Sequence, residues 1–281
     1  MRLLRNWVSN TAAIWLAVLL SGLISLTPWW QGIELNGFDV LSRLTAPGPS
    51  SLPITVILID EESMAQIGRQ WPWPRSLHAR LLEQLKSAQV AVVAFDVLFS
   101  EPAAVAEDDV ALERSIRQNG PVVLAANVEY RETAAARLWM RVDPLPRFLA
   151  AGAIPGLAAV ELDRDGVLRR FPLTSEALWR QVAQQLERQQ PGVVARLAAV
   201  PDQRIRYHAG TQAFASIPYY RMLDPDRYLA LDWREQLRDN IVLVGRSVKA
   251  ATEVGAAQSD LFLTPFFASG GEMMPDRKSV V

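Results

Sequence analysis

ITVILID at residues 54–60 and VAVVAFDVLF at residues 90–99 are two almost wholly apolar runs of strand length. Between them, residues 76–88 have the periodicity of an amphipathic helix, with Leu77, Leu81, Leu82 and Leu85 on one face. Strands that are apolar along their whole length need cover on both faces, which is typical of parallel sheets joined through helices. This strand, helix and strand predict the start of an α/β domain.

The same pattern continues in the next part of the chain. Residues 108–118 have helical periodicity, and residues 122–128 form another apolar run. Because crossovers between parallel strands are right-handed, we expect the three strands to lie side by side. The predicted fold class is α/β, with a mixed, mainly parallel sheet and helices on both faces.

Beyond Tyr130 the pattern changes. Residues 158–162 and 167–173 flank Asp-Arg-Asp-Gly at 163–166, a turn-forming sequence, and predict a β-hairpin. Residues 175–189 are predicted as a helix, with Ser175 as its N-cap. Later strands are expected at 203–208, 214–217 and 241–245.

The N-terminal segment carries no charged residue from Asn6 to Ile33. Within it, Val8–Leu26 is a mostly apolar run of 19 residues. As a helix this run would span roughly 28 Å, close to the hydrocarbon thickness of a bilayer of about 30 Å. A signal peptide has a shorter apolar region, and Ser21-Gly22-Leu23 is only a weak cleavage site, so an uncleaved transmembrane helix is favoured.

The flanking residues predict the orientation of this helix. Trp29 and Trp30 suit the far membrane interface, whereas Arg2 and Arg5 favour a cytoplasmic N-terminus. We therefore expect a cytoplasmic N-terminus at 1–7, a lipid-contacting signal anchor at 8–30 and a periplasmic or extracellular domain at 31–275. The predicted location is the inner membrane, crossed once by this chain.

A short amphipathic helix is expected between the anchor and the domain. Leu35, Phe38, Leu41 and Leu44 recur at steps of three residues before Pro47-Gly48-Pro49 ends the pattern. Such a helix can serve only for packing, or it can carry a signal as a stalk. The sequence leaves both interpretations open.

The composition argues against several classes of protein. Half of the 281 residues are hydrophobic, and 29 Lys and Arg nearly balance 30 Asp and Glu, which argues against nucleic-acid binding. Without cysteine, the chain has no disulfide, thiolate zinc site or cysteine nucleophile. Phosphate-loop, serine-elbow, zinc-protease and dinucleotide motifs are also absent. We expect a non-enzymatic domain with no cofactor, and we interpret His78 as a surface or packing residue.

The densest group of chemically useful side chains follows the first two predicted strands. Ligands of doubly wound sheets bind beyond the carboxyl ends of the strands, so these side chains predict a pocket for a small polar or cationic ligand. In the alternative, purely structural interpretation, Asp60 and Asp96 cap turns and Arg75 neutralises them. The candidate ligand-binding residues are Asp60, Trp71, Trp73, Arg75, Asp96 and Glu101.

Several short motifs also occur in a characteristic order. They are Asp39-Val-Leu-Ser-Arg43, Ile57-Leu-Ile-Asp60, Trp71-Pro-Trp-Pro-Arg75 with His78, Phe95-Asp-Val-Leu-Phe99 with Glu101-Pro102, and Asp260-Leu-Phe-Leu-Thr-Pro-Phe266. In combination they closely resemble the CHASE2 extracellular sensor domain over roughly residues 31–275. The resemblance implies a bacterial sensory module behind one transmembrane helix. In that family, three further membrane helices and a cytoplasmic cyclase, kinase or diguanylate cyclase domain typically follow.

The C-terminal part departs from the family pattern. Residues 246–259 are longer and more irregular than the usual turn. After Pro275, where a strand and further membrane helices are expected, the chain reads Asp-Arg-Lys-Ser-Val-Val and ends. We interpret residues 276–281 as a non-native tail on a truncated protein.

These observations lead to one main hypothesis and two others. The main hypothesis is the sensory input domain of a membrane receptor, expected to form a homodimer, whose absent output domain is a class III nucleotide cyclase or, alternatively, a kinase or diguanylate cyclase. The second is an anchored hydrolase that uses Asp60 and Asp96 with a divalent cation. The third is a structural module that dimerises a receptor without a ligand.

Overall fold

The computed structural model of the chain consists of two compact units, residues 1–46 and 47–281, which are described separately. The tail at 276–281 and most of the irregular segment 246–259 lie outside the described residues. The structure describes residues 2–50, 52–132, 137–172, 174–189, 191–192, 204–208, 213–247, 261–262, 264–266 and 274–275.

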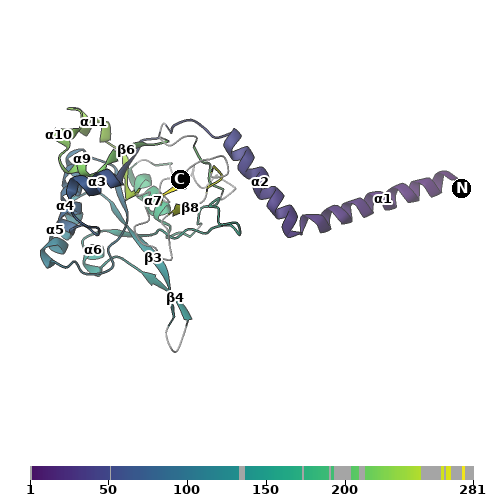
Figure 1. Cartoon of the computed structure of the whole chain (residues 1–281), viewed down its shortest axis with the longest axis horizontal. Helices are drawn as coiled ribbons and strands as arrows, with labels where there is room; N and C mark the ends of the chain where they lie inside the picture. Colours follow the sequence, from purple (N-terminus) through teal and green to yellow (C-terminus); the bar gives the residue numbers. More distant parts are fainter. Residues whose placement is uncertain are drawn as a thin grey trace. The chain divides into compact units, whose positions relative to one another are not determined.

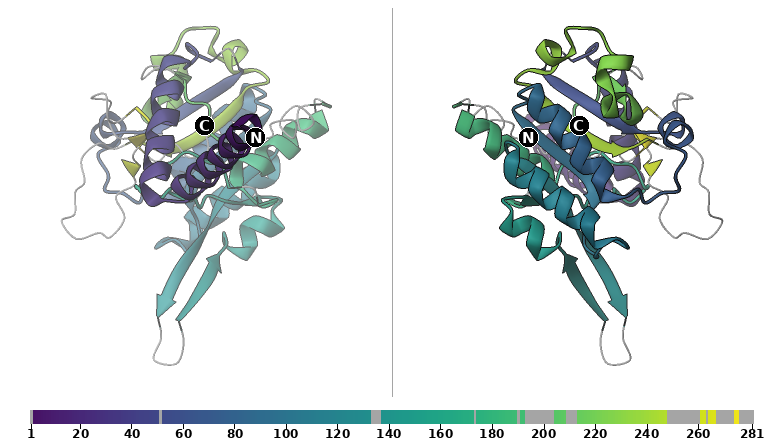
Figure 2. Two further views of the ribbon diagram at one scale, coloured as in Figure 1. Left: turned by 90° about the vertical axis from the view of Figure 1, so that its right-hand side faces the viewer. Right: turned by 90° about the vertical axis from the view of Figure 1, so that its left-hand side faces the viewer.

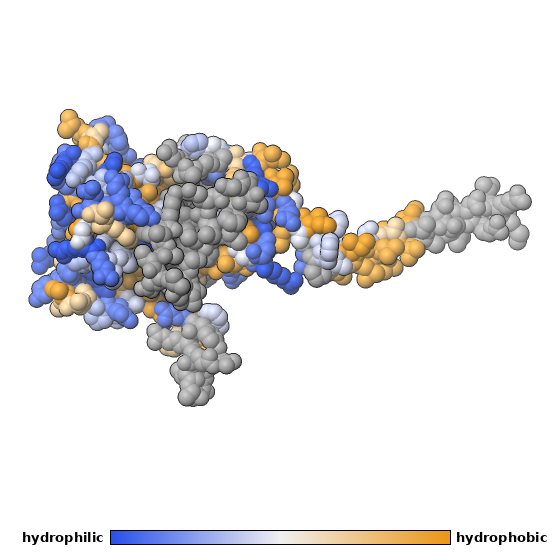
Figure 3. Space-filling view, viewed as in Figure 1, coloured by the Kyte–Doolittle hydropathy of each residue, from blue (hydrophilic) through white to orange (hydrophobic). Residues whose placement is uncertain are grey.

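The N-terminal unit contains two helices, α1 (Arg2–Ser25) and α2 (Pro28–Leu44). The chain breaks between them because Thr27 caps α2, its side chain accepting a hydrogen bond from the Trp30 N–H, and Pro28 begins the new helix. The amphipathic helix predicted before Pro47 is confirmed as part of α2. Hydrophobic residues cover the described part of α1 (Figure 3).

The membrane anchor at 8–30 stays a prediction. Among the described residues, neither helix alone has the length and hydropathy to cross a bilayer. Ile14–Ser25 and Trp29–Leu44 together would have them, with a bend of 75° between the two segments.

The second unit is built on a sheet to which the described residues contribute seven strands (Figure 1). Its order is β4-β3-β2-β7-β1-β6, with β5 also beside β3. Every pair is parallel except β3 with β4, which confirms the predicted mainly parallel sheet. The strands are β1 (Ile54–Ile59), β2 (Val92–Leu98), β3 (Val122–Glu132), β4 (Arg137–Val142), β5 (Ile154–Leu157), β6 (Ala215–Pro218) and β7 (Ile241–Arg246).

One expectation about the strand order is wrong. β2 and β3 are neighbours as predicted, but β1 and β2 are separated by β7, whose Ile241 is in register with both Ile54 and Val92. The inserted strand is apolar on both faces, and Val242, Leu243 and Val244 are all buried. The central position therefore buries more of the apolar surface of β7 than a position at the edge of the sheet would.

Helices cover both faces of the sheet, as predicted (Figure 2). Helices α4, α5, α6, α9 and α11 contribute to the core on one face, whereas α7 packs on the other. The connection from β5 to β6 crosses the sheet in the opposite direction to the earlier ones, so a right-handed crossover places α7 on the opposite face. The helices of this unit are α3 (Glu61–Ile67), α4 (Arg75–Ser87), α5 (Ala106–Gln118), α6 (Pro146–Ala150), α7 (Leu178–Gln189), α9 (Tyr219–Leu223), α10 (Pro225–Tyr228) and α11 (Trp233–Leu237).

The hairpin predicted at 158–173 is wrong for the residues that are described. A turn is present, in which the Asp163 N–H donates to the Val167 carbonyl and Gly166 has φ of 78°. No strand flanks it in the described residues, and Arg169 donates hydrogen bonds to both Asp163 and Asp165 beside the turn. The strand expected at 203–208 is likewise reduced, in its described part, to a bridge between Arg204 and Arg170.

A two-stranded arm extends from the sheet. The outer half of β3 pairs with β4 from Asn127 with Val142 to Glu132 with Arg137, and the arm projects from the body (Figures 1 and 2). A second, small antiparallel pair joins β8 (Leu261–Phe262) to β9 (Met274–Pro275).

Candidate ligand-binding cavity

A cavity of about 620 Å³ opens at the carboxyl ends of β2 and β7 and beside the middle of β3. Its wall is formed by residues 71–75, by the loop 99–105, by residues 125–127 of β3 and by Arg246 at the end of β7. Pockets for small molecules commonly have about 300–1,000 Å³ and lie where the strand order of an α/β sheet reverses. Here the direction of the connections reverses after β5, and Ala158, the residue that follows β5, lines the cavity.

The aromatic wall of the cavity comes from the segment before α4. Trp73 is buried, and its indole N–H donates to the Arg69 carbonyl over 3.1 Å. Trp71 meets it edge to face, with ring centroids 5.4 Å apart. Pro74 occupies the N-cap position of α4, so the helix begins at Arg75 and holds the preceding turn against the core.

Arg75 binds groups on two other segments of the cavity wall. Its guanidinium donates to the Asp109 carboxylate on α5 and to the Glu101 carbonyl in the loop 99–105. Its Cζ also lies 5.5 and 5.4 Å from the ring centroids of Phe99 and Phe148, within cation–π range. Arg75 therefore joins α4, α5 and the loop, and its partner is not one of the two predicted aspartates.

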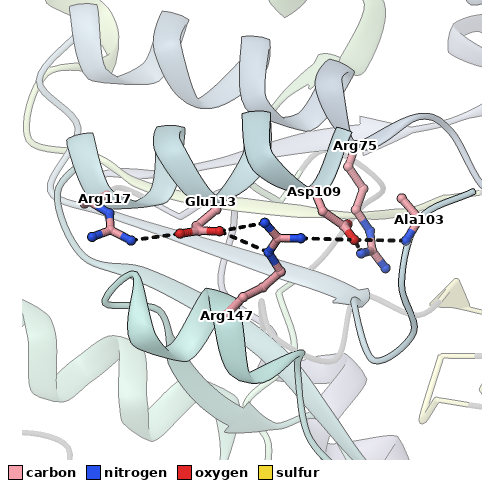
Figure 4. Close-up of polar contacts among 6 residues, drawn as sticks. All are labelled: Arg75, Ala103, Asp109, Glu113, Arg117 and Arg147. Atoms are coloured by element: carbon pink, nitrogen blue, oxygen red, sulfur yellow. Dashed lines mark hydrogen bonds and ion pairs between the residues drawn. The ribbon is translucent and has the colours of Figure 1, made fainter. Parts of the chain in front are cut away.

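Asp109 is the centre of a wider polar network (Figure 4). It also accepts a hydrogen bond of 3.1 Å from the Ala103 N–H, which fixes the loop at the rim of the cavity. Arg147 on α6 lies 3.7 Å from Asp109 and donates to Glu113 over 2.9 Å. The hydrogen bond from Arg147 lowers the pKa of Glu113, and Arg117 adds a further contact of 2.8 Å.

A buried pair of polar residues lies behind the aromatic wall. His78, which lines the cavity, is 1% exposed, and its Nδ1 forms a hydrogen bond of 2.8 Å with the Tyr219 hydroxyl. Burial, with a smaller contribution from the Arg75 charge, lowers the pKa of His78 to about 3. Burial also raises the pKa of Tyr219. Both groups are therefore neutral at physiological pH, and His78 is the packing residue that the sequence predicted.

Asp96 and Arg246 bring charged groups to the cavity from the sheet itself. The β2–β3 ladder is irregular between Phe95 and Leu98, so Asp96 lies outside the regular pairing. Such irregularities commonly redirect a side chain at a site. The Arg246 guanidinium lies 5.7 Å from the centroid of the Trp71 ring. A carboxylate, a guanidinium and an indole thus all line the cavity, a combination suited to a small polar or charged ligand.

The structure brings five of the six predicted residues together. Trp71, Trp73, Arg75, Asp96 and Glu101 all line the cavity, whereas Asp60 does not. Asp60 instead caps α3, accepting a hydrogen bond of 2.8 Å from the Ser63 N–H. The capping role that the alternative interpretation gave to Asp60 is therefore the one observed. Asp60 and Asp96 do not line the same cavity, which argues against the hydrolase hypothesis in which both bind one cation.

Sequence reasoning missed Asp109, Tyr219 and Arg246. Asp109 lies in the first turn of α5, where acidic residues are common for helix-dipole reasons, so nothing marked it as the partner of Arg75. Arg246 follows a strand that was predicted, but its place beside Trp71 depends on the insertion of β7. In the part of the chain that the structure describes, no group of three His, Asp or Glu residues could hold a metal ion.

Comparisons with known proteins gave one match. The family model of the CHASE2 domain matches residues 12–276, nearly the whole chain. No curated protein and no solved structure matches it.

Proposed function

The chain belongs to the CHASE2 domain family of extracellular sensory domains in signalling receptors, and we propose that its cavity receives the signal. In this proposal the protein is the extracytoplasmic input domain of a bacterial membrane receptor. A small polar or ionic ligand binds in the cavity and changes the balance between two conformations of the domain. The observation that carries the proposal is the cavity of about 620 Å³ at the strand-order reversal.

The contacts of the rim support a conformational response. The loop 99–105 is held at one point by Arg75, through the Glu101 carbonyl, and at another by Asp109, through the Ala103 N–H. A ligand that displaces this loop also acts on α4 and α5, because the same two side chains begin on those helices. Binding energy is thereby converted into a change of helix packing.

The membrane connection is part of the proposal. The absence of charge from Asn6 to Ile33 and the exposed apolar residues of α1 favour a lipid-embedded segment at 8–30. The domain is joined to α2 by the chain around Pro47, so a change in the domain reaches the membrane through that connection. The output domain is proposed to be a class III nucleotide cyclase, with a kinase or diguanylate cyclase as the alternative, and a genomic read past codon 275 identifies it.

Thermal shift measurements on the full chain in detergent test the ligand site. A metabolite and ion library is screened for compounds that raise the melting temperature, and each hit is repeated with Asp96→Asn and Trp71→Ala. We expect the shift to be lost in both variants, because both side chains line the cavity. The matched control is Asp60→Asn, an aspartate outside the cavity, which keeps the shift. Equal shifts in the wild type and in Asp96→Asn would reject this site.

A further inference from the structure

His78 has a ring nitrogen that faces the ligand cavity. The side chain is 1% exposed and is part of the cavity wall. Its Nδ1 is hydrogen-bonded to the Tyr219 hydroxyl, whereas its Nε2 has no hydrogen-bond partner among the described residues. Nε2 is not enclosed by protein atoms either. The small exposed surface of His78 therefore includes Nε2, and this atom is open to the cavity.

The hydrogen bond with Tyr219 determines which ring nitrogen of His78 carries the proton. Tyr219 is 0% exposed, so its hydroxyl hydrogen cannot reach solvent. In the described part of the chain, the hydroxyl has one hydrogen-bond partner, His78 Nδ1, at 2.8 Å. A buried donor without an acceptor is costly, so the hydroxyl donates and Nδ1 accepts. Because the ring is neutral at physiological pH, its one proton lies on Nε2.

The surroundings of His78 favour an oxygen acceptor over a cation at this nitrogen. The imidazole ring meets the rings of Trp71, Phe95 and Phe99 edge to face, with centroids 6.3, 5.8 and 5.3 Å away. The positive charge of Arg75 also acts on the imidazole. An N–H donor and a positive charge attract an oxygen atom and repel a cation. The inner end of the cavity is therefore apolar, with a single donor that selects an acceptor.

The rim of the cavity has the opposite charge. Glu101 in the loop 99–105 is exposed, Asp108 at the start of α5 is half-buried, and both line the cavity. Carboxylates at this position repel an anionic group that stays at the rim. A ligand with one oxygen acceptor is therefore oriented, with the acceptor toward His78 and away from the loop.

We propose that the His78 Nε2–H group recognises the ligand, and that the ligand is a small molecule with a carbonyl or carboxylate oxygen on a planar apolar body. The oxygen accepts the hydrogen bond from Nε2, and the planar body packs against the rings of Trp71 and Phe99, which also line the cavity. A metal ion or an ammonium group does not fit this position, because a protonated Nε2 has no lone pair to offer either. This inference names the ligand class and rests on the proposed function.

NMR of the full chain in detergent, with ¹⁵N only in the histidine rings, tests the position of the proton. The chain has two histidines, His78 and His208, and a His208→Gln variant assigns their signals. At about pH 8, where both rings are neutral, we expect His78 to be protonated at Nε2. His208 is the internal control. Its Nδ1 lies 2.6 Å from the Gly48 carbonyl, which can only accept, so its proton is expected on Nδ1. A proton on Nδ1 of His78 would overturn the proposal.

Three probes of similar shape test the ligand class in the same spectra. Benzoate and benzamide carry an oxygen acceptor on a planar ring, whereas benzylamine carries a cation. We expect the two acceptors to shift the Nε2 signal of His78 in a saturable way and to leave His208 unchanged. Benzylamine should produce a several-fold smaller shift. No shift with either acceptor, or an equal shift with benzylamine, contradicts the assignment.

Substitutions of His78 separate this inference from the proposed function. His78→Gln keeps an amide N–H donor, whereas His78→Phe keeps a ring and removes the donor. In thermal shift measurements we expect stabilisation by benzamide to be lost in His78→Phe and at least half of it to remain in His78→Gln. Equal stabilisation of the wild type and both variants, together with its loss in Trp71→Ala, rejects the donor and leaves the cavity standing. Stabilisation that none of these substitutions changes rejects the cavity, and with it the proposed function.

Discussion

The two faces of the central sheet are covered by different kinds of side chain. On one face, α4, α5, α6, α9 and α11 pack with many aromatic rings, and this face also holds the buried His78–Tyr219 pair and the Arg75–Asp109 ion pair. On the other, α7 packs through aliphatic side chains such as Leu178, Val182 and Leu186.

The difference indicates that one face fixes the arrangement of the helices around the cavity through buried polar groups, whereas the other contributes mainly apolar packing. Buried polar groups are costly unless each one is satisfied, so they fix one arrangement of the elements that carry them. Here they lie on the face where the cavity opens. On the aliphatic face, the buried Gln185 accepts a hydrogen bond from Arg188, and the main contribution of the face is close packing. Four measurements, from the largest expected effect to the smallest, test this contrast.

Removing Asp109 is expected to have the largest effect. In Asp109→Ala, the Arg75 guanidinium, 11% exposed in the fold, keeps its burial but loses its carboxylate. Breaking a buried ion pair in this way costs about 3–5 kcal/mol of unfolding free energy. Urea denaturation followed by circular dichroism measures the loss. Glu107→Ala, an exposed neighbour on the same helix, is the control and should change stability by less than about 0.5 kcal/mol. A similar loss in both variants would show that the buried Arg75–Asp109 pair contributes no more to stability than an exposed acidic residue of the same helix.

On the aliphatic face, the sensitive position is a glycine rather than a charge. A Cβ on Gly156 in β5 would come within 2.8 Å of the Leu178 Cα in α7. Gly156→Ala therefore forces α7 away from the sheet, and we expect a loss of about 1–3 kcal/mol in the same urea assay. Gly120→Ala, where an added methyl group meets nothing within 4 Å, should be nearly neutral. If the two alanine variants melt alike, close packing of α7 does not limit stability.

The buried histidine predicts acid sensitivity of the aromatic face. The pKa of His78 falls from about 6.5 in the unfolded chain to about 3 in the fold, so its stabilising contribution is complete above pH 6.5. As the pH falls below 6.5, the unfolded state binds the proton first, and stability declines by up to about 1.4 kcal/mol per pH unit. Urea midpoints measured between pH 7 and 5 give this slope. The interval lies above the pH range in which paired carboxylates titrate, so those groups contribute little to it.

The matched variant for this measurement is His78→Phe. It keeps an aromatic ring among Phe95, Phe99 and Tyr219 but cannot bind a proton. We expect it to be less stable at pH 7, because the Tyr219 hydroxyl loses its partner. Its stability should also vary less between pH 7 and 5. An unchanged slope would show that other groups cause the acid sensitivity.

The smallest effect is expected at Asp60. Asp60→Ala removes the cap of α3, which costs about 1 kcal/mol, and leaves the cavity wall intact. Asp60→Ser, which retains a capping oxygen, should recover most of that loss. A thermal melt compares the three proteins. A larger loss than that of Asp109→Ala would reverse the ranking of the two aspartates.

Local patterns allowed most of the first half of the fold to be predicted. The apolar runs at 54–60 and 90–99 correspond to β1 and β2, and the leucine periodicity of 76–88 corresponds to α4. These elements are specified by the pattern of apolar residues over a few positions, and the tertiary structure keeps the conformation that each local pattern favours. The five cavity residues were also accessible, because the carboxyl ends of parallel strands share one edge of the sheet.

The remaining features depend on contacts between distant residues. The place of β7 between β1 and β2 is decided by competition among strands for the centre of the sheet, and no local pattern records it. The turn at 163–166 resembled a hairpin because the sequence does not show that Arg169 binds both aspartates. The partner of Arg75 was missed for the same reason, since Asp109 lies 34 residues further along the chain.

The central position of β7 has a consequence for biogenesis. During synthesis, β1 and β2 cannot form their native pairs with β7 until that strand has been made, some 150 residues after β2 begins. Until then, the two apolar strand edges that β7 will occupy have no native partner, and unpaired edges of this kind favour misassociation. Folding of this domain is therefore a late event, completed only after nearly all of it has been delivered.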